Sequence, residues 1–144
     1  MKGQRTLEQA AKDDVKFVSL QFTDLLGVIK EVIIPVGELK DALVDGVWFD
    51  GSSIEGFARI QESDLFLKPD NSTYCVVPWL ADNGKTARII CDIYRPDGSP
   101  FEGDPRFILK KVMAQAAEIG YEYNVGPEPE FYLFIRDQAG NRSR

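Results

Sequence analysis

The sequence contains no histidine, which removes the residue used most often as a general base and as a transition-metal ligand. Any metal bound by this chain is therefore expected to be a hard ion held by oxygen, such as Mg²⁺ or Mn²⁺. Cysteine is nearly as scarce. Cys75 and Cys91 each lie in an apolar, strand-like run, which favours two buried free thiols over a disulfide or a ligand role.

Basic clusters and long apolar runs are missing as well. The 17 Lys and Arg are outnumbered by 23 Asp and Glu, and the net charge is -6. Nucleic-acid recognition requires clustered Lys and Arg, so we expect no nucleic-acid partner. No apolar run reaches membrane-spanning length, and the polar start at residues 1–6 has no apolar segment typical of a secretory signal. The sequence therefore predicts a cytoplasmic protein with no membrane partner.

The 144 residues, 44% of them hydrophobic, suffice for one modest domain or for one domain and the start of another. Periodicity and turn signals predict a set of short elements. The expected helices cover 6–13, where Thr6–Gln9 has the form of a capping box, then 38–44, and 105–119 with Asp104 as its cap. The expected strands cover 15–22, 28–35, 65–68, 73–79, 86–94, 121–125 and 130–136. Helices and strands do not alternate regularly, which favours an α+β fold over a doubly wound sheet.

A loop is expected at residues 48–63, a segment rich in Gly and Ser that also carries large apolar side chains. Within it, Asp50 precedes a glycine and two hydroxyl residues. One interpretation is an Asx-turn, in which the carboxylate accepts from backbone amides just ahead of it. The other is a functional carboxylate that binds a cation or accepts a proton at a partner surface.

Glu128 and Glu130 form the sharpest acidic pair, between two prolines and an apolar run. In a strand, residues two apart project from the same face, and two parallel carboxylates repel unless a cation lies between them. The pair predicts a divalent-metal site, and the alternative is a solvated strand edge with two surface acids. A third polar group contains Arg59 and Asp64. Taken alone, it is interpreted as a charged, salt-bridged strand entry.

Three motifs together resemble the N-terminal motifs of bacterial-type glutamine synthetase. They are Asp50-Gly51-Ser52-Ser53-Ile54-Glu55-Gly56-Phe57, Glu62-Ser63-Asp64, and Gly126-Pro127-Glu128-Pro129-Glu130-Phe131. They occur in the family's order and at family-like spacing, and the likeness extends from about Val15 to Phe134. Three long motifs in order are far more specific than any one alone.

The resemblance implies a ligase that phosphorylates the side chain of glutamate with ATP and then lets ammonia displace the phosphate through a γ-glutamyl phosphate. By motif position, Glu130 is expected to bind a Mg²⁺ or Mn²⁺ ion near glutamate, and Glu128 a second ion near the ATP phosphates. Asp50 is expected to take a proton from ammonium, with Ser53 in the ammonium pocket and Asp64 supporting the loop. Arg59 resembles a residue involved in feedback inhibition by glutamine.

The resemblance also implies an architecture. Residues 1–100 are expected to form a β-grasp N-terminal domain, and residues 101–144 the first helix and strands of a catalytic barrel domain. The family assembles as two stacked hexameric rings, and its active sites lie between subunits. The Asp50 loop is therefore expected to act on the neighbouring subunit, while Glu128 and Glu130 serve the site of their own chain.

The sequence reads as cut off, because the apolar run 131–135 and the turn after it lead to only three more residues. The segments that supply histidine, the other metal ligands and the substrate-binding arginines of such an enzyme are not in these residues. We therefore expect the chain alone to be inactive. An alternative from a different class is a truncated, non-catalytic relative that binds or modulates a full-length glutamine synthetase.

Overall fold

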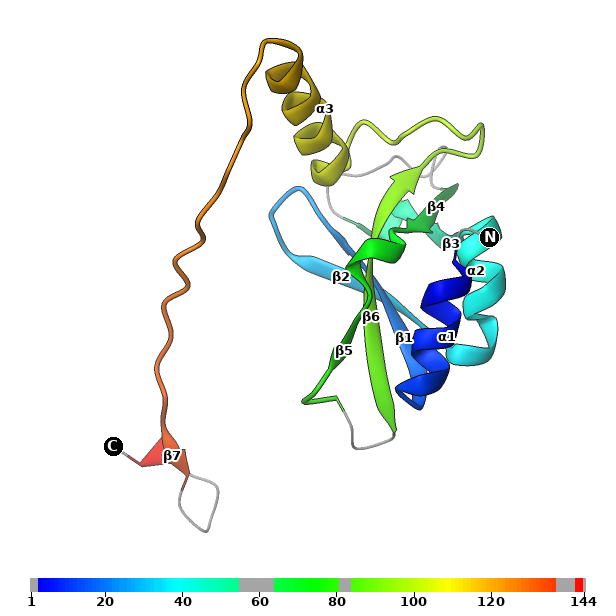
Figure 1. The fold of residues 1–144 in the computed structure, drawn as a ribbon, viewed down its shortest axis with the longest axis vertical. Coiled ribbons are helices and arrows are strands. Elements are labelled where there is room, and N and C mark those ends of the chain that lie inside the picture. Colours follow the sequence, from blue (N-terminus) through cyan, green and yellow to red (C-terminus); the bar gives the residue numbers. More distant parts are fainter. Residues whose placement is uncertain (1–2, 55–63, 81–83, 137–141, 144) are drawn as a thin grey trace.

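The computed structural model describes residues 3–54, 64–80, 84–136 and 142–143. Figure 1 shows a curled sheet with two helices on one side, a third helix at its end and an extended segment that runs away from it. The helices are α1 (Gln4–Lys12), α2 (Leu39–Asp45) and α3 (Pro105–Glu118), and the short 3-10 turns are η1 (Val36–Glu38), η2 (Gly51–Ser53) and η4 (Asn71–Thr73). The strands are β1 (Val15–Thr23), β2 (Ile29–Pro35), β3 (Val47–Asp50), β4 (Asp64–Pro69), β5 (Cys75–Val77), β6 (Lys85–Tyr94), β7 (Ile135–Arg136) and β8 (Arg142–Ser143).

The main sheet has the order β2-β1-β6-β4-β3, with β5 also paired to β6. β1 and β2 form the expected hairpin, since Phe17 pairs with Pro35 and Thr23 with Ile29. Its turn is fixed by Asp24, whose Oδ1 accepts from the amides of Leu26 at 2.9 Å and Val28 at 2.8 Å. The central pairing, β1 with β6, is parallel, and every other pairing in this sheet is antiparallel.

The hydrophobic core lies between the sheet and the helices α1 and α2. Alternating residues of the central strands point into it, as the period of two in a strand requires. The fully buried members include Val18, Leu20, Leu65, Leu67, Ile89, Ile93 and, from α2, Leu39. This packing explains why residues far apart in the chain form one unit, and it confirms the predicted α+β fold.

The start of α1 differs from the prediction. The helix begins at Gln4, and Gly3 stands at its N-cap with no side-chain cap hydrogen bond. Thr6 lies inside the helix and is only 6% exposed. The predicted capping box at Thr6–Gln9 is therefore wrong, because packing of Thr6 beside the core carries the helix one turn further back than the local motif indicates.

The start of α3 matches the prediction. Asp104 caps it by accepting from the amide of Arg106 at 2.9 Å, and Pro105 occupies the first turn. Gly120 follows the helix with a φ of 87°, a backbone conformation that favours glycine. An apolar pocket of about 360 Å³ beside the helix is lined by Pro105, Ile108, Leu109, Val112, Met113, Ala116 and Tyr123.

The predicted strands at 121–125 and 130–136 are largely wrong. Residues 121–134 are extended but belong to no ladder, and pairing begins only at Ile135 and Arg136. Apolar side chains here are open to solvent, with Phe131 74% and Leu133 89% exposed. A strand needs a neighbour to satisfy its amides and carbonyls. Among the described residues, only β8 supplies one.

The two cysteines are both free, as expected, but only Cys91 is buried. Burial raises the pKa of the Cys91 thiol to about 12, so it stays protonated and behaves as a small apolar side chain. Cys75 is exposed on β5, which corrects the prediction of two buried thiols. In the described part of the chain, no helix is long and apolar enough to cross a membrane.

Candidate functional site

Asp50 and Asp64 lie opposite each other at the end of the β3–β4 ladder. They are the last of four antiparallel pairs that begin with Val47 and Leu67, and both carboxylates are exposed. β3 was not predicted, because residues 48–63 were interpreted as a loop. Its formation is what brings Asp50 close to Asp64, a proximity that sequence spacing alone does not reveal. Two carboxylates facing each other across a ladder create a site of negative potential that favours a cation.

The carboxylate of Asp50 is held by the turn that follows it. Its Oδ1 accepts from the Ser52 amide at 2.9 Å and from the Ser52 hydroxyl at 2.6 Å, and it caps η2. The Asx-turn interpretation is thus confirmed. It does not compete with the functional one, because the same bonds fix the orientation of a carboxylate that stays exposed at the strand end.

Two aromatic side chains anchor β3 from opposite faces. Phe49 packs toward the core, with its ring centroid 4.9 Å from that of Phe22. Trp48 points the other way and contacts Phe66 at 5.3 Å, and Phe66 stacks on Tyr94 at 5.6 Å. The three rings form a row across β3, β4 and β6. Trp48 is still 59% exposed, so the row ends in an open apolar surface beside Asp50.

The other residues proposed for this site are placed only in part. Ser53 closes the 3-10 turn η2, whose Ile54 amide donates to the Gly51 carbonyl at 3.1 Å. Arg59 lies outside the described residues, as does the rest of residues 55–63. The prediction of a regulatory role for Arg59 therefore stays a prediction.

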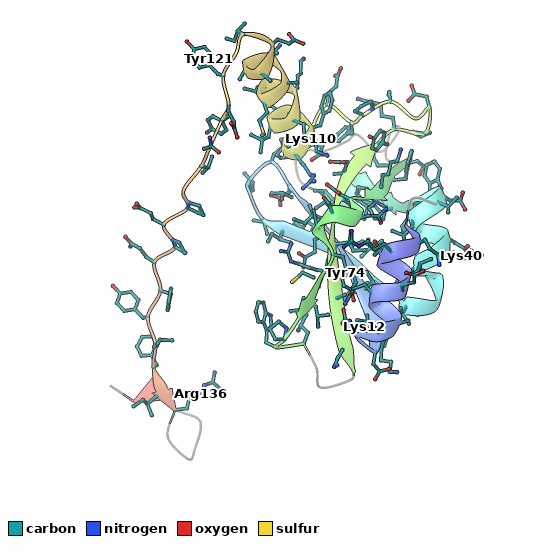
Figure 2. All side chains as sticks on the ribbon, in the orientation of Figure 1. Lys12, Lys40, Tyr74, Lys110, Tyr121 and Arg136 are labelled. Carbon is teal, nitrogen blue, oxygen red and sulfur yellow. The ribbon has the colours of Figure 1, made fainter. Side chains whose placement is uncertain are left out.

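Glu128 and Glu130 are both exposed in the extended segment before β7. Figure 2 shows that the segment between the labelled Tyr121 and Arg136 runs away from the sheet. Carboxylate oxygens suit a hard ion such as Mg²⁺. Within the described ranges, however, no group of three or more His, Cys, Asp or Glu side chains could hold a metal. The donor type fits a magnesium site, and the number of donors found here covers only part of one.

A second charged cluster, which the sequence did not predict, joins α3 to the sheet. Arg106 bridges Asp92 of β6 and Asp70 at the turn after β4, and Lys110 also pairs with Asp92. The Ser72 hydroxyl and, more weakly, Arg106 hold the pKa of Asp70 below its usual value, although burial opposes them. Burial raises the pKa of Asp104, despite the amides that its carboxylate accepts from. Spacing places Arg106 and Lys110 on one face of α3 but gives no signal for Asp70 and Asp92, because these two come together only through the pairing of β4 with β6.

The chain matches two family models. The model described as "Glutamine synthetase, beta-Grasp domain" matches residues 14–96, and the one described as "Glutamine synthetase, catalytic domain" matches residues 102–144. The first match contains Asp50 and Asp64, and the second contains Glu128 and Glu130.

Two curated relatives and one solved structure that resemble this chain are glutamine synthetases. The glutamine synthetases of Staphylococcus aureus strain MW2 and Staphylococcus epidermidis strain ATCC 35984 are each 52% identical over 132 residues, which is 91% of this chain and 30% of the relative. A Plasmodium falciparum glutamine synthetase solved by cryo-electron microscopy superposes with a TM-score of 0.74 at 32% identity, over 83% of this chain and 23% of that one. A GmaS/ADP complex superposes with a TM-score of 0.72 at 28% identity, over 79% and 26%. The chain thus spans about 30% of the length of the curated relatives.

Proposed function

Because this chain belongs to the glutamine synthetase family, we propose that it is the N-terminal part of an ATP-dependent glutamate–ammonia ligase. The observation that carries the proposal is the Asp50–Asp64 pair, held at an exposed strand end within the matched β-grasp segment. We propose two domains that correspond to the two family matches: residues 1–100 form the β-grasp domain, and residues 101–144 begin the catalytic domain.

Asp50 is proposed to act on ammonia. Ammonium has no lone pair, so it must lose a proton before it can displace phosphate from a γ-glutamyl phosphate, and a nearby carboxylate can accept that proton. Ser52 orients the Asp50 carboxylate through two hydrogen bonds to Oδ1. Asp64, directly across the ladder, adds negative charge that favours binding of the ammonium ion. Ser53 is proposed to line the same pocket.

Glu128 and Glu130 are proposed as metal ligands toward ATP and glutamate, respectively. A divalent ion there, Mg²⁺ or Mn²⁺, would screen phosphate charge and hold the glutamate carboxylate. The support is the oxygen chemistry of the two side chains and their location in the segment matched to the catalytic domain. The remaining ligands of a site with about six oxygens must come from other residues or from water.

The open apolar surface beside Asp50 supports a homo-oligomer. Trp48 ends the aromatic row and is 59% exposed, which is typical of a side chain that a partner covers. We propose that this surface lies against the neighbouring subunit of a ring, a dodecamer in the complete family enzyme, and that Asp50 acts there in trans. Glutamate, ammonia and ATP are the proposed substrates, and the cytoplasm is the proposed location. Arg59 is proposed to contribute to feedback regulation.

The test uses a chimera in which this chain replaces the matching 132-residue part of the Staphylococcus aureus relative. We expect the chimera to form glutamine from glutamate, ammonia and ATP in a Mg²⁺-dependent manner. Asp50→Asn should lower kcat about 10²- to 10⁴-fold, as expected for loss of a general base. Asp45→Asn, an exposed carboxylate at the end of α2, is the matched control and should leave kcat unchanged. A folded chimera in which both variants behave alike would refute the role of Asp50.

The 144-residue chain by itself is proposed to be inactive, because the described residues hold only two of the expected metal ligands in the matched catalytic segment. ATP- and Mg²⁺-dependent glutamine formation by the purified chain would contradict this. Mixing the chain with an intact glutamine synthetase tests the alternative role as a modulator. Co-elution with an altered rate would favour the modulator, and independent elution with an unchanged rate would exclude it.

A further inference from the structure

The helix α3 is attached to the sheet by charged side chains rather than by apolar packing. None of its residues is buried, and its large apolar side chains are open to solvent: Ile108 is 46%, Leu109 50% and Val112 54% exposed. Apolar burial, which holds α1 and α2 in place, therefore contributes little here. Some other set of contacts must fix the direction of α3.

Arg106 supplies the central contact. Its Nε donates to Asp92 Oδ1 at 2.8 Å, and one of its terminal nitrogens pairs with Asp70 Oδ2. The two carboxylates come from different elements, β6 and the turn before η4. The planar guanidinium has donors in a fixed fork, so binding both carboxylates restrains its orientation as well as its position. All three side chains are only 21–25% exposed, which reduces screening by water.

Lys110 extends the contact by one helical turn. Residues four apart lie on the same face of a helix, and the Nζ atom of Lys110 reaches both oxygens of Asp92, at 2.7 and 2.6 Å. Figure 2 shows the labelled Lys110 where α3 meets the sheet. Two successive turns of α3 are therefore tied to one residue of β6.

Asp104 fixes the point at which the chain enters α3. Its Oδ2 accepts from the Ile93 amide of β6 at 3.1 Å, while its Oδ1 accepts from the Arg106 amide at 2.9 Å. Just before it, the Phe101 amide donates to the Ile93 carbonyl at 2.9 Å, and the Phe101 ring is buried in the core. The connection between β6 and α3 is thus bonded to the sheet, which fixes where α3 begins and leaves its direction to Arg106 and Lys110.

We propose that these side chains form a joint that orients the catalytic-domain segment on the β-grasp domain, with Arg106 as its positioning residue. The polar joint consists of Asp70, Asp92, Asp104, Arg106 and Lys110. It bridges the two matched segments, because its first two residues lie in 14–96 and its last three in 102–144. By setting the direction of α3, it sets the path along which the chain continues to Glu128 and Glu130. That consequence for the metal ligands rests on the proposed function, whereas the joint itself rests on the contacts alone.

The test is ¹⁵N relaxation of the 144-residue chain, which reports whether two parts of a molecule tumble together. In the unmodified chain, amides of α3 should show the same tumbling time as those of β1 and β6. In Arg106→Gln, the tumbling time of α3 should fall below that of the sheet, while Cα chemical shifts show that the helix is still formed. Lys111→Gln removes the same charge from an exposed neighbour outside the joint, and it should leave both times equal.

Asp92→Asn provides a second variant in case Arg106→Gln does not fold. It removes the carboxylate shared by Arg106 and Lys110 and should release α3 in the same way. Common tumbling in a folded Arg106→Gln or Asp92→Asn chain would overturn the proposal, and so would independent tumbling of α3 in the unmodified chain. This measurement involves no ligase activity, so its failure is distinct from a failure of the chimera assay.

Discussion

Replacement of Asp104 by alanine tests how the buried carboxylate stabilises the chain. The side chain is 1% exposed and accepts from two amides, one in β6 and one in the first turn of α3. Loss of a helix cap costs about 1 kcal/mol. A buried amide left without a partner, here that of Ile93, costs a further ~1–3 kcal/mol. Part of this loss is offset, because burial disfavours the ionised Asp104 carboxylate, as its raised pKa indicates, and the alanine variant no longer buries that charge. We therefore expect a net loss of about 1–3 kcal/mol in the free energy of unfolding.

The assay is urea unfolding at neutral pH, monitored by tryptophan fluorescence. The free energies of unfolding of the variants are compared using the same m-value. Asp97→Ala is the matched control. Asp97 accepts from the amide and hydroxyl of Ser99 in an exposed turn, so its loss should cost less than about 1 kcal/mol. Asp104→Asn keeps one acceptor oxygen and should fall between the two alanine variants. An Asp104→Ala chain within ~0.5 kcal/mol of the unmodified chain would refute the reasoning, because the two amides would then not depend on this carboxylate.

Further expectations concern the turn after α2, the pH dependence and the acidic pair. A Cβ at Gly46 would lie 2.7 Å from a backbone carbonyl oxygen of β4, and its φ is 78°, so Gly46→Ala should cost ~2 kcal/mol or more in urea unfolding. Gly37→Ala meets nothing within 4 Å and should change stability by less than ~1 kcal/mol; equal effects would contradict the steric argument. Because the pKa of Asp70 is lowered in the folded state, its stabilisation is complete above its usual value of 3.8 and is lost as the pH falls through the lower folded value. The stability difference between the unmodified chain and Asp70→Asn should therefore shrink as the pH is lowered below 3.8, and a difference that stays constant would argue against an ionised Asp70. Mn²⁺ titrated into the chain should bind at Glu128 and Glu130 no more tightly than ~1 mM, and submicromolar binding would reveal ligands beyond this pair.

The parts of the fold that follow from local rules could be predicted from the sequence. Alternation along residues 15–22 and 28–35 predicted the β1–β2 hairpin, and Asp104 followed by Pro105 predicted the start of α3. Those signals act over a few residues. The parallel pairing of β1 with β6 could not be predicted from such local signals, because it joins strands about seventy residues apart and depends on the whole core.

The errors have physical causes that are equally specific. β3 was missed because Gly51 and the serines after it indicate a loop, whereas cross-strand contacts of Trp48 and Phe49 stabilise a strand just before them. The strands expected at 121–125 and 130–136 were over-extended because β-propensity describes a side chain on a sheet surface and does not supply the neighbouring strand. The candidate site shows the same limit. Asp50 and Asp64 were each identified by motif, but only the register of β3 on β4 puts them face to face.

The most direct test of the central claim is complementation between two inactive chimeras. One carries Asp50→Asn and the other Glu130→Gln, and they are dissociated, mixed in equal amounts and reassembled. If Asp50 serves the neighbouring subunit while Glu130 serves its own, about a quarter of all sites in the reassembled oligomers should contain both native side chains and recover glutamine formation. If both residues belonged to one chain's site, no mixed site would contain both. Reassembled oligomers without any recovered activity would contradict the account.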